Sequence, residues 1–261
     1  MEVAILFLMV IGLMLIGVPI AISLGMSSIV FLLVLSDTSL ASIAQTLFQA
    51  MAGHYTLLAI PFFILASSFM STGGVAKRII RFAIAIVGHL PGGLGVAGIL
   101  SSAIFAAISG SSIVTMLAIG SVIYPAMREA GYTKKFALGT VMSGGTLGII
   151  IPPSIPLILY GLVTETSIVD LFRAGVGPGL LLVGLFAIYS VVVNRHMKTE
   201  RFSLSGLMSA LRSGIWALMM PVILLGGIYS GFFSPTEAAA VALVYAVIVE
   251  LAIHREIGLP E

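Results

Sequence analysis

Residues 142–156 read Met-Ser-Gly-Gly-Thr-Leu-Gly-Ile-Ile-Ile-Pro-Pro-Ser-Ile-Pro, and this stretch decides the fold. The segments on both sides of it are apolar and have helical length, yet the stretch itself holds several glycines and prolines. Glycine weakens a helix interior, and proline removes an amide donor that an uninterrupted helix needs. We therefore predict a discontinuous transmembrane helix over about 135–164, with one half from about 135 to 143 and the other from about 154 to 164.

The chain around this stretch has the composition of a membrane protein. Of its 261 residues, 59% are apolar and 8% are charged, whereas soluble domains carry about a quarter charged residues. Apolar segments recur along the whole chain, and a crossing takes about 20 helical residues. Besides the broken helix, we predict spans near 3–17, 18–36, 55–73, 175–194, 214–231 and 236–253. The fold class that follows is an all-α polytopic membrane protein.

The same composition argues against several functions. No basic tract interleaves with aromatic residues as a nucleic-acid surface would, so we expect no nucleic-acid partner. The chain has no cysteine, which excludes disulfides and thiolate metal sites, and its four histidines lie near the ends of apolar segments. We expect no catalytic residue and no organic cofactor.

The basic residues mark one side of the membrane. They form four groups: Lys77 to Arg81, Arg128 to Lys135, Arg195 to Arg212, and Arg255. The positive-inside rule places all four in the cytoplasm, with Arg173 as the one exception. Residues 92–127 are apolar but lie between two groups on the same side, so they cross twice or enter and return. Each arm supplies only about 20 to 22 Å of helix, which predicts a re-entrant hairpin over about 92–127.

Two shorter segments have an amphipathic pattern. Residues 40–52 and 76–88 are predicted to form helices that lie in the membrane plane. The alternative is that each extends a neighbouring span.

The hairpin midpoint is the first candidate for a site. Its sequence, Ile108-Ser109-Gly110-Ser111-Ser112, is too polar for a turn that faces lipid. Non-helical backbone at membrane depth is tolerated only where it is buried in protein or lines a cavity. A hard cation such as sodium needs oxygen ligands, which the tip hydroxyls and the carbonyls freed by the broken helix supply. The predicted sodium ligands are Ser109, Gly110, Ser111, Ser112, Ser143, Gly144, Gly145 and Gly148.

The second half of the broken helix is the candidate for anion binding. It begins near Ser154, and its positive N-terminal end favours a carboxylate. The predicted substrate-binding residues are Thr146, Pro152, Pro153 and Ser154. A simpler reading stays open for both parts of the site, because small residues also let helices pack closely and Gly or Pro also produce kinks.

A weak internal repeat predicts the domain organisation. Gly12 to Gly17 followed by Pro19 recurs as Gly226 to Gly231 followed by Pro235. Because an odd number of crossings separates the copies, they have opposite orientation, as in inverted-repeat transporters. We predict a first structural repeat over 1–200 and the start of a second, incomplete inverted repeat over 201–261. Glu237 is expected to lie in the first turn of a helix.

Four stretches resemble the large membrane subunit of TRAP (tripartite ATP-independent periplasmic) transporters, the DctM-like family. They are Ile60-Pro61-Phe62-Phe63, Ser109 to Ser112, Ser143 to Gly148 with Ile151 to Ser154, and Gly231 to Ala238. The resemblance covers essentially the whole chain. It implies sodium-coupled uptake of an organic acid, such as a C4-dicarboxylate, through the bacterial inner membrane.

The resemblance also implies partners and a site. The partners are a small four-helix membrane subunit and a periplasmic substrate-binding protein, and the coupling ion is Na⁺. In that family the first hairpin and the following broken helix form one sodium site, which corresponds here to Ser109 to Ser112 and Ser143 to Gly148. Such subunits continue through a complete second repeat, so this chain is expected to lack most of it.

Other functions remain as alternatives. One is an inactive or assembly-only fragment of such a permease, and another is a different inverted-repeat anion carrier. An intramembrane serine hydrolase would use Ser111 or Ser112, but such a nucleophile needs a base, and no histidine or lysine is predicted at that depth.

Overall fold

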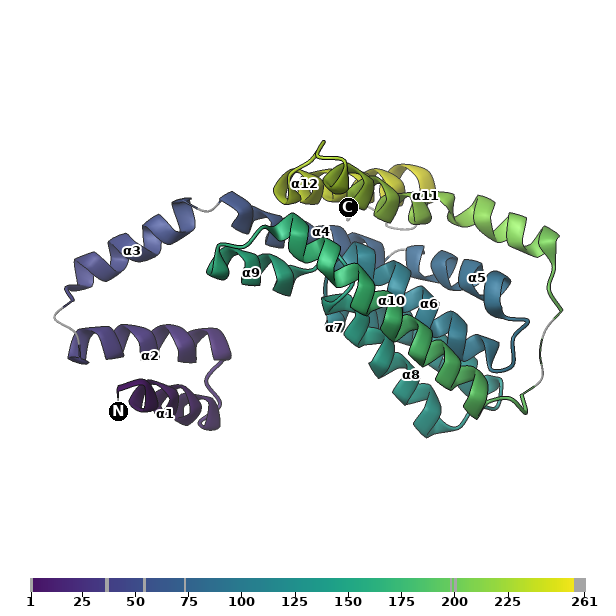
Figure 1. Cartoon of the computed structure of the whole chain (residues 1–261), viewed down its shortest axis with the longest axis horizontal. Helices are drawn as coiled ribbons and strands as arrows, with labels where there is room; N and C mark the ends of the chain where they lie inside the picture. The colour runs from purple at the N-terminus through teal and green to yellow at the C-terminus, as the bar shows by residue number, and fades with distance from the viewer. Residues whose placement is uncertain are drawn as a thin grey trace. The chain divides into compact units, whose positions relative to one another are not determined.

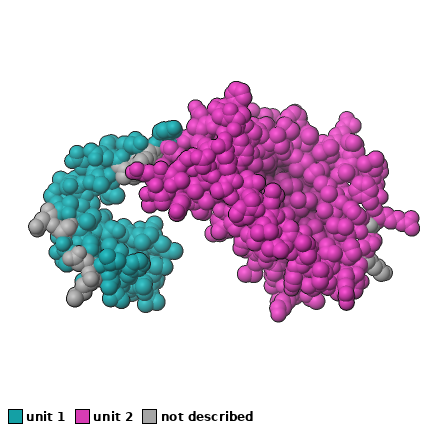
Figure 2. Space-filling view, viewed as in Figure 1, with its two compact units in different colours: residues 1–55 teal, residues 56–261 magenta. Residues whose placement is uncertain are grey.

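The computed structural model describes residues 2–255 other than 36, 37, 54, 73, 198 and 200, and these residues form helices and their connections with no strand among them (Figure 1). The all-α prediction is therefore confirmed. The chain divides into two compact units, residues 1–55 and 56–261, which Figure 2 shows in different colours.

The first unit contains three helices: α1 (Glu2–Leu15), α2 (Ile20–Leu35) and α3 (Leu40–Gly53). Helices α1 and α2 pack side by side. Most of their described side chains are exposed and apolar, whereas Ser23 and Ser27 of α2 are buried. Such an exposed apolar surface is what a helix pair in a bilayer presents to lipid.

The second unit contains the rest of the described structure. Its elements are the 3₁₀-helix η1 (Tyr55–Leu58), α4 (Ala59–Thr72), α5 (Val75–Val87), α6 (Gly93–Ser109), α7 (Ser112–Glu129), α8 (Lys134–Thr146), the 3₁₀-helix η2 (Leu147–Ile149), α9 (Ile155–Thr164), α10 (Ile168–Val193), α11 (Leu204–Tyr229), α12 (Pro235–Val247) and the π-helix η3 (Ile248–His254).

The core of this unit combines large apolar side chains with many alanines. Helix α12 packs against α4. Four alanines of α12 are fully buried, and the α4 side chains in the same core include Phe63 and Met70. Small residues let helix backbones approach closely, which is the usual way that helices associate in a membrane.

Length and composition make three described helices long and apolar enough to cross a membrane: α10, α11, and the segment Pro235–His254. A fourth candidate combines η1 and α4 with α5, which bends by 70° from them. Helices α1 and α2 are apolar but shorter. The structure thus has helices in all the predicted span ranges, although not all of them reach full spanning length.

Two helices begin earlier than the sequence prediction. Helix α10 was expected from 175 but begins at Ile168, and α11 was expected from 214 but begins at Leu204. In both, a serine immediately before the helix accepts a hydrogen bond from an amide of the first turn: Asp170 N–H donates to Ser167 Oγ and Gly206 N–H to Ser203 Oγ. The prediction placed polar residues outside the spans, whereas these caps extend the helices through them.

The two segments predicted to be amphipathic form separate helices, α3 and α5. Helix α5 buries an apolar face that includes Val75, Ile79 and Ala83, and exposes Lys77 and Arg81. Helix α5 is therefore amphipathic, as predicted, and the position of both helices in the membrane plane stays a prediction.

The two copies of the predicted repeat share a local backbone geometry. After α1, Gly17 has φ +92°, and after α11, Gly231 has φ +80°. Each glycine is followed within a few residues by a proline at the start of the next helix, Pro19 before α2 and Pro235 as the first residue of α12. The repeat boundary near residue 200 stays a prediction. The Ser234–Glu237 capping box places Glu237 in the first turn of α12, where the sequence predicted it.

Candidate functional site

The predicted hairpin is formed by α6 and α7, which pack against each other and are joined at Gly110 and Ser111. Gly110 has a left-handed conformation, with φ +59°, and its amide donates to the carbonyl oxygen of Ala106. Glycine adopts this conformation without steric cost. Ser111 is extended, and α7 begins at the next residue.

Buried hydroxyl groups lie inside the hairpin tip. The Ser109 and Thr115 side chains are fully buried, and their hydroxyl oxygens are 2.6 Å apart, within hydrogen-bond distance. The Ser111 amide also donates to Ser109 Oγ over 3.3 Å. Ser111 and Ser112 themselves are half-buried. The tip is therefore a polar, oxygen-rich point within an apolar helix pair.

The break that the sequence predicts in the helix over about 135–164 is present. Helix α8 ends at Thr146, three residues beyond the predicted end, and continues for one turn as η2. The chain then leaves helical geometry through Pro152 and Pro153, which share a cis peptide bond, and α9 begins at Ile155. The buried Ser154 hydroxyl donates to the carbonyl oxygen of Ile149 over 2.8 Å. This hydrogen bond connects the two sides of the break.

The hairpin tip and the break are in direct contact. The Ile155 amide, the first of α9, donates to the Gly110 carbonyl oxygen over 3.2 Å. A methyl group added at Gly110 would lie 2.8 Å from the carbonyl oxygen of Pro153, and one added at Gly148 would lie 2.5 Å from that of Ser111. These glycines are required because the two backbones touch.

Two further glycines of α8 face the hairpin. A methyl group added at Gly144 would lie 2.4 Å from Ser102 Oγ of α6, and one added at Gly145 would lie 2.9 Å from Met116 Cβ of α7. Sequence reasoning missed Ser102, which is buried on the face of α6 that packs against α8. The signal it offered was a pair of adjacent serines, Ser101 and Ser102, in an otherwise apolar segment.

Helix polarity converges at this contact. Helix α6 and the α8–η2 segment end here with their carbonyl groups, while α7 and α9 begin here with their amides. Helix C-termini carry partial negative charge and favour cations, and N-termini carry partial positive charge and favour anions. The arrangement can therefore place a cation and a carboxylate near each other. Because Pro156 has no amide hydrogen and the Ile155 amide is already used, α9 offers few free donors to an anion.

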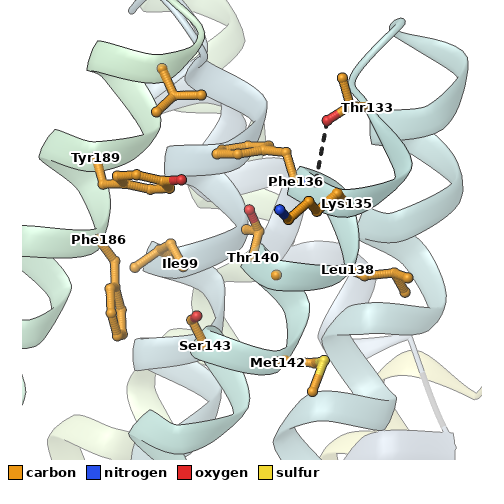
Figure 3. A pocket seen from close by; sticks show the side chains of 12 residues that line it. Ile99, Thr133, Lys135, Phe136, Leu138, Thr140, Met142, Ser143, Phe186 and Tyr189 are labelled. Carbon is orange, nitrogen blue, oxygen red and sulfur yellow. Dashed lines mark hydrogen bonds between the residues drawn. The ribbon is translucent and has the colours of Figure 1, made fainter.

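Not every predicted residue lies at the contact. The Thr146 side chain is exposed, and its hydroxyl donates to the Ser143 carbonyl oxygen over 2.7 Å. The Ser143 side chain lines a separate cavity of about 630 Å³ between α8 and α10 (Figure 3). The residues at the contact are Gly110, Ser111, Ser112, Gly145, Gly148, Pro153 and Ser154. Ser109 lies within the tip, and Gly144 faces Ser102 in the middle of α6.

The cavity between α8 and α10 was not anticipated. Thr140 and Ser143 line it from α8, and Phe186 and Tyr189 line it from α10 across the space (Figure 3). Lys135 lies at the α8 N-terminus, where the Phe136 amide donates to Thr133 Oγ1. Thr140 and Ser143 are three residues apart and so share one face of α8, which the sequence shows. The sequence does not show that α10 lies across from this face and supplies the aromatic wall of the cavity.

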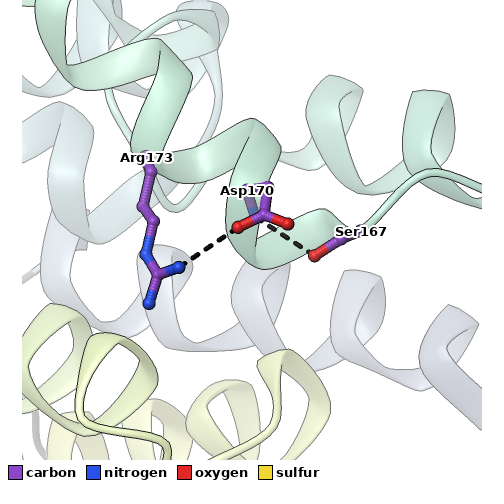
Figure 4. A network of polar contacts seen from close by, with 3 residues as sticks. All are labelled: Ser167, Asp170 and Arg173. Atoms are coloured by element: carbon purple, nitrogen blue, oxygen red, sulfur yellow. Dashed lines mark hydrogen bonds and ion pairs between the residues drawn. The ribbon is translucent and has the colours of Figure 1, made fainter.

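Arg173, the one basic residue that did not fit the positive-inside pattern, forms an ion pair with a nearby residue. Arg173 lies in α10, and its Nη1 is 3.2 Å from Oδ1 of Asp170 (Figure 4). Both side chains are more than half exposed. Its charge is thus compensated within the first turns of α10, which explains why Arg173 occurs among acidic and polar residues.

Comparison with known proteins agrees with this architecture. The family model described as the DctM component of the tripartite ATP-independent periplasmic transporter matches residues 7–261. The C4-dicarboxylate TRAP transporter large permease protein DctM of Vibrio cholerae is 55% identical over 261 residues, which cover 99% of this chain and 58% of that protein.

Relatives named for other substrates are also similar. The ectoine TRAP transporter large permease protein TeaC of Halomonas elongata is 41% identical over 96% of this chain and 60% of its own length. The 2,3-diketo-L-gulonate TRAP transporter large permease protein YiaN of Escherichia coli is 40% identical over 92% of this chain and 57% of its own. The chain thus spans less than two thirds of the length of these relatives. With the family model matching almost its whole length, the chain belongs to the DctM family of tripartite ATP-independent periplasmic transporter components.

Proposed function

We propose that this chain forms part of the large permease subunit of a TRAP transporter and takes part in sodium-coupled uptake of an organic acid across the bacterial inner membrane. The observation that carries the proposal is the contact between the hairpin tip and the break, where four helix ends meet. Inverted-repeat carriers place ion and substrate at such interruptions.

The cation would be held by neutral oxygens. Among the described residues, no three His, Cys, Asp or Glu side chains gather as a metal site would require. A monovalent cation needs no carboxylate, and the contact offers the buried hydroxyls of Ser109 and Thr115 and the carbonyl ends of α6 and η2. Sodium is the cation that we propose, and it is transported rather than retained.

The anion would lie against the N-terminal ends of α7 and α9. Few α9 amides are free, so we assign the attraction mainly to the positive helix ends and to Ser111 and Ser112, whose side chains are half-buried. C4-dicarboxylates are the first substrates to test, because the similar Vibrio cholerae protein is named for them. Thr146, Pro152, Pro153 and Ser154 remain the proposed substrate-side residues, with Pro153 and Ser154 shaping the backbone there.

The partners follow from the family. The relatives are named as large permease proteins of a tripartite system, which implies a small membrane subunit and a periplasmic binding protein that delivers the substrate. We propose the same partners here and a carrier function rather than an enzymatic one.

The proposal is tested by sodium-dependent stability. Purified chain should unfold at a higher temperature in sodium than in potassium at equal ionic strength, since a ligand that binds only the folded state stabilises it by about 2.7 kcal/mol at 100 times its Kd. Gly148→Ala should abolish this shift because its methyl group meets the Ser111 backbone. Gly139→Ala, whose methyl group would meet nothing within 4 Å, should retain it.

Uptake separates the carrier from the assembly-only alternative. Proteoliposomes that contain the chain, the small subunit and the binding protein should accumulate radiolabelled succinate when a sodium gradient is imposed. A sodium shift without uptake would favour a fragment that binds the ion but does not transport. Absence of any sodium shift in the unmodified chain would contradict the proposed site.

A further inference from the structure

A second cavity lies between α5 and the beginning of α11, away from the hairpin tip. Its volume is about 330 Å³, and its lining includes Arg81, His89, Arg201 and Ser203 together with Ile84 and Phe202. No Asp or Glu is among its lining residues. Each of the two walls of the cavity therefore carries an arginine together with apolar residues.

Two arginines line this cavity, Arg81 from α5 and Arg201 from the residues before α11. In the part of the chain that the structure describes, neither Arg81 nor Arg201 forms an ion pair, and both are exposed. By contrast, Arg173 on α10 is paired with Asp170. The His89 ring contacts the edge of Phe202, with centroids 5.4 Å apart. Two guanidinium groups that line one cavity, with no carboxylate among its lining residues, favour an anionic ligand.

The surroundings of the cavity indicate the depth of the lipid headgroups. Helix α5 is amphipathic, with a buried apolar face and exposed Lys77 and Arg81. The amphipathic pattern predicts that such a helix lies at the membrane interface. The basic groups also belong to the side that the charge pattern assigns to the cytoplasm. Basic pockets between helices at this level bind anionic lipid headgroups.

An apolar surface continues from the cavity along α11. Leu204 and Met208 are 67% and 60% exposed and, being four residues apart, share one face of the helix. Phe202, which lines the cavity, is also more than half exposed. A lipid whose phosphate lay between the arginines could lay its acyl chains along these side chains.

We propose that this cavity binds the phosphate of an anionic phospholipid such as phosphatidylglycerol. Arg81 and Arg201 hold the phosphate oxygens by charge-assisted hydrogen bonds, and Ser203 lines the same cavity. Because Arg81 belongs to α5 and Arg201 precedes α11, the bound lipid links the two helices at the interface.

The test uses the purified full chain in nanodiscs of phosphatidylcholine with increasing fractions of phosphatidylglycerol. We expect phosphatidylglycerol to raise the unfolding temperature and to remain bound in native mass spectra. The Arg81→Gln/Arg201→Gln variant should bind it at least about tenfold more weakly, since hydrogen bonds to charged groups are lost. The matched control, Arg195→Gln/Arg212→Gln, removes the same charge from exposed residues outside the cavity and should bind as the unmodified chain does.

A third arm distinguishes lipid from soluble anion. Inorganic phosphate added to chain in pure phosphatidylcholine should not reproduce the stabilisation. If it does, the cavity binds a free anion and the lipid assignment is wrong. Equal loss in both double variants would show diffuse surface attraction instead of a site, and no phosphatidylglycerol effect in the unmodified chain would overturn the proposal.

Discussion

Two pairs of helices, α1–α2 and α6–α7, turn at a glycine with positive φ but differ in what surrounds it. Gly17, between α1 and α2, has φ +92°, and a methyl group added there would meet nothing within 4 Å. Gly110, between α6 and α7, has φ +59°, and its methyl group would lie 2.8 Å from the Pro153 carbonyl oxygen. Both turns need glycine locally, but only the second also needs it for a tertiary contact.

The difference shows how a site can be recognised among apolar helices. The described α1–α2 side chains are largely exposed, as suits residues that face lipid, whereas the α6 side chains are mostly buried in protein. Polar and backbone groups are tolerated at the α6–α7 turn because α8 and η2 pack against this hairpin and the first amide of α9 bonds to the turn.

The largest expected effect concerns topology and is all-or-none. The chain has no cysteine, so Lys77→Cys and Lys134→Cys, both at exposed positions flanking the α6–α7 hairpin, provide single labelling sites. A membrane-impermeant maleimide should label both only from the cytoplasmic side. Thr166→Cys lies in the segment Glu165 to Asp170, which contains none of the four cytoplasmic basic groups, and should label only from the periplasm. Labelling of either lysine position from the periplasm would contradict the prediction of a re-entrant hairpin.

The next effect compares the two turns directly. Gly17→Ala should cost about 1 to 2 kcal/mol of stability, since a left-handed conformation is unfavourable for alanine. Gly110→Ala carries the same cost and an added clash of about 1 to 3 kcal/mol. Chemical denaturation of the two variants in the same detergent measures the difference. Equal losses would mean that the tip and the break do not touch as described.

Hydroxyl removal is expected to act on ion binding more than on stability. Ser109→Ala or Thr115→Val should raise the sodium concentration for half-maximal thermal stabilisation by about tenfold, because a hydrogen bond to a charged group contributes about 1.5 to 3 kcal/mol. Ser23→Ala in α2 serves as the control. It removes a buried hydroxyl that donates to the carbonyl oxygen of Val18, within the α1–α2 pair. Its sodium dependence should not change. Unaltered sodium dependence in all three variants would favour the packing reading of the tip.

The smallest effect is expected at the exposed ion pair. Asp170→Asn should lower stability by no more than about 1 kcal/mol, because exposed pairs contribute little and are screened by salt. Arg173→Gln should behave in the same way and leave the sodium shift intact. A loss of several kcal/mol in either variant would mean that the start of α10 is buried in the working protein.

Local chemistry made the hairpin and the break predictable from the sequence. Glycine and proline both weaken a helix interior, and the cluster of glycines and prolines around Pro152 and Pro153 favours a break over a continuous helix. The early starts of α10 and α11 were missed because the predicted spans were limited to the apolar stretches 175–194 and 214–231. Ser167 and Ser203 are nevertheless suitable N-cap residues.

Tertiary partners set the limit for the rest of the site. The side chain of Ser143 points into the α8–α10 cavity, which depends on the rotation of α8 about its axis and on the position of α10. The close approach of Gly144 to Ser102 likewise depends on how α6 faces α8. Neither is a property of a local segment.

The hydrogen bond from the Ile155 amide to the Gly110 carbonyl also has a mechanical meaning. It joins two interruptions that are 45 positions apart in the chain, counting from Gly110 to Ile155. Leaving these groups unpaired away from water costs several kcal/mol. The hairpin tip and the start of α9 should therefore move together as one rigid body. Any hinge for such a movement has to lie elsewhere in the chain, outside the tip and the start of α9.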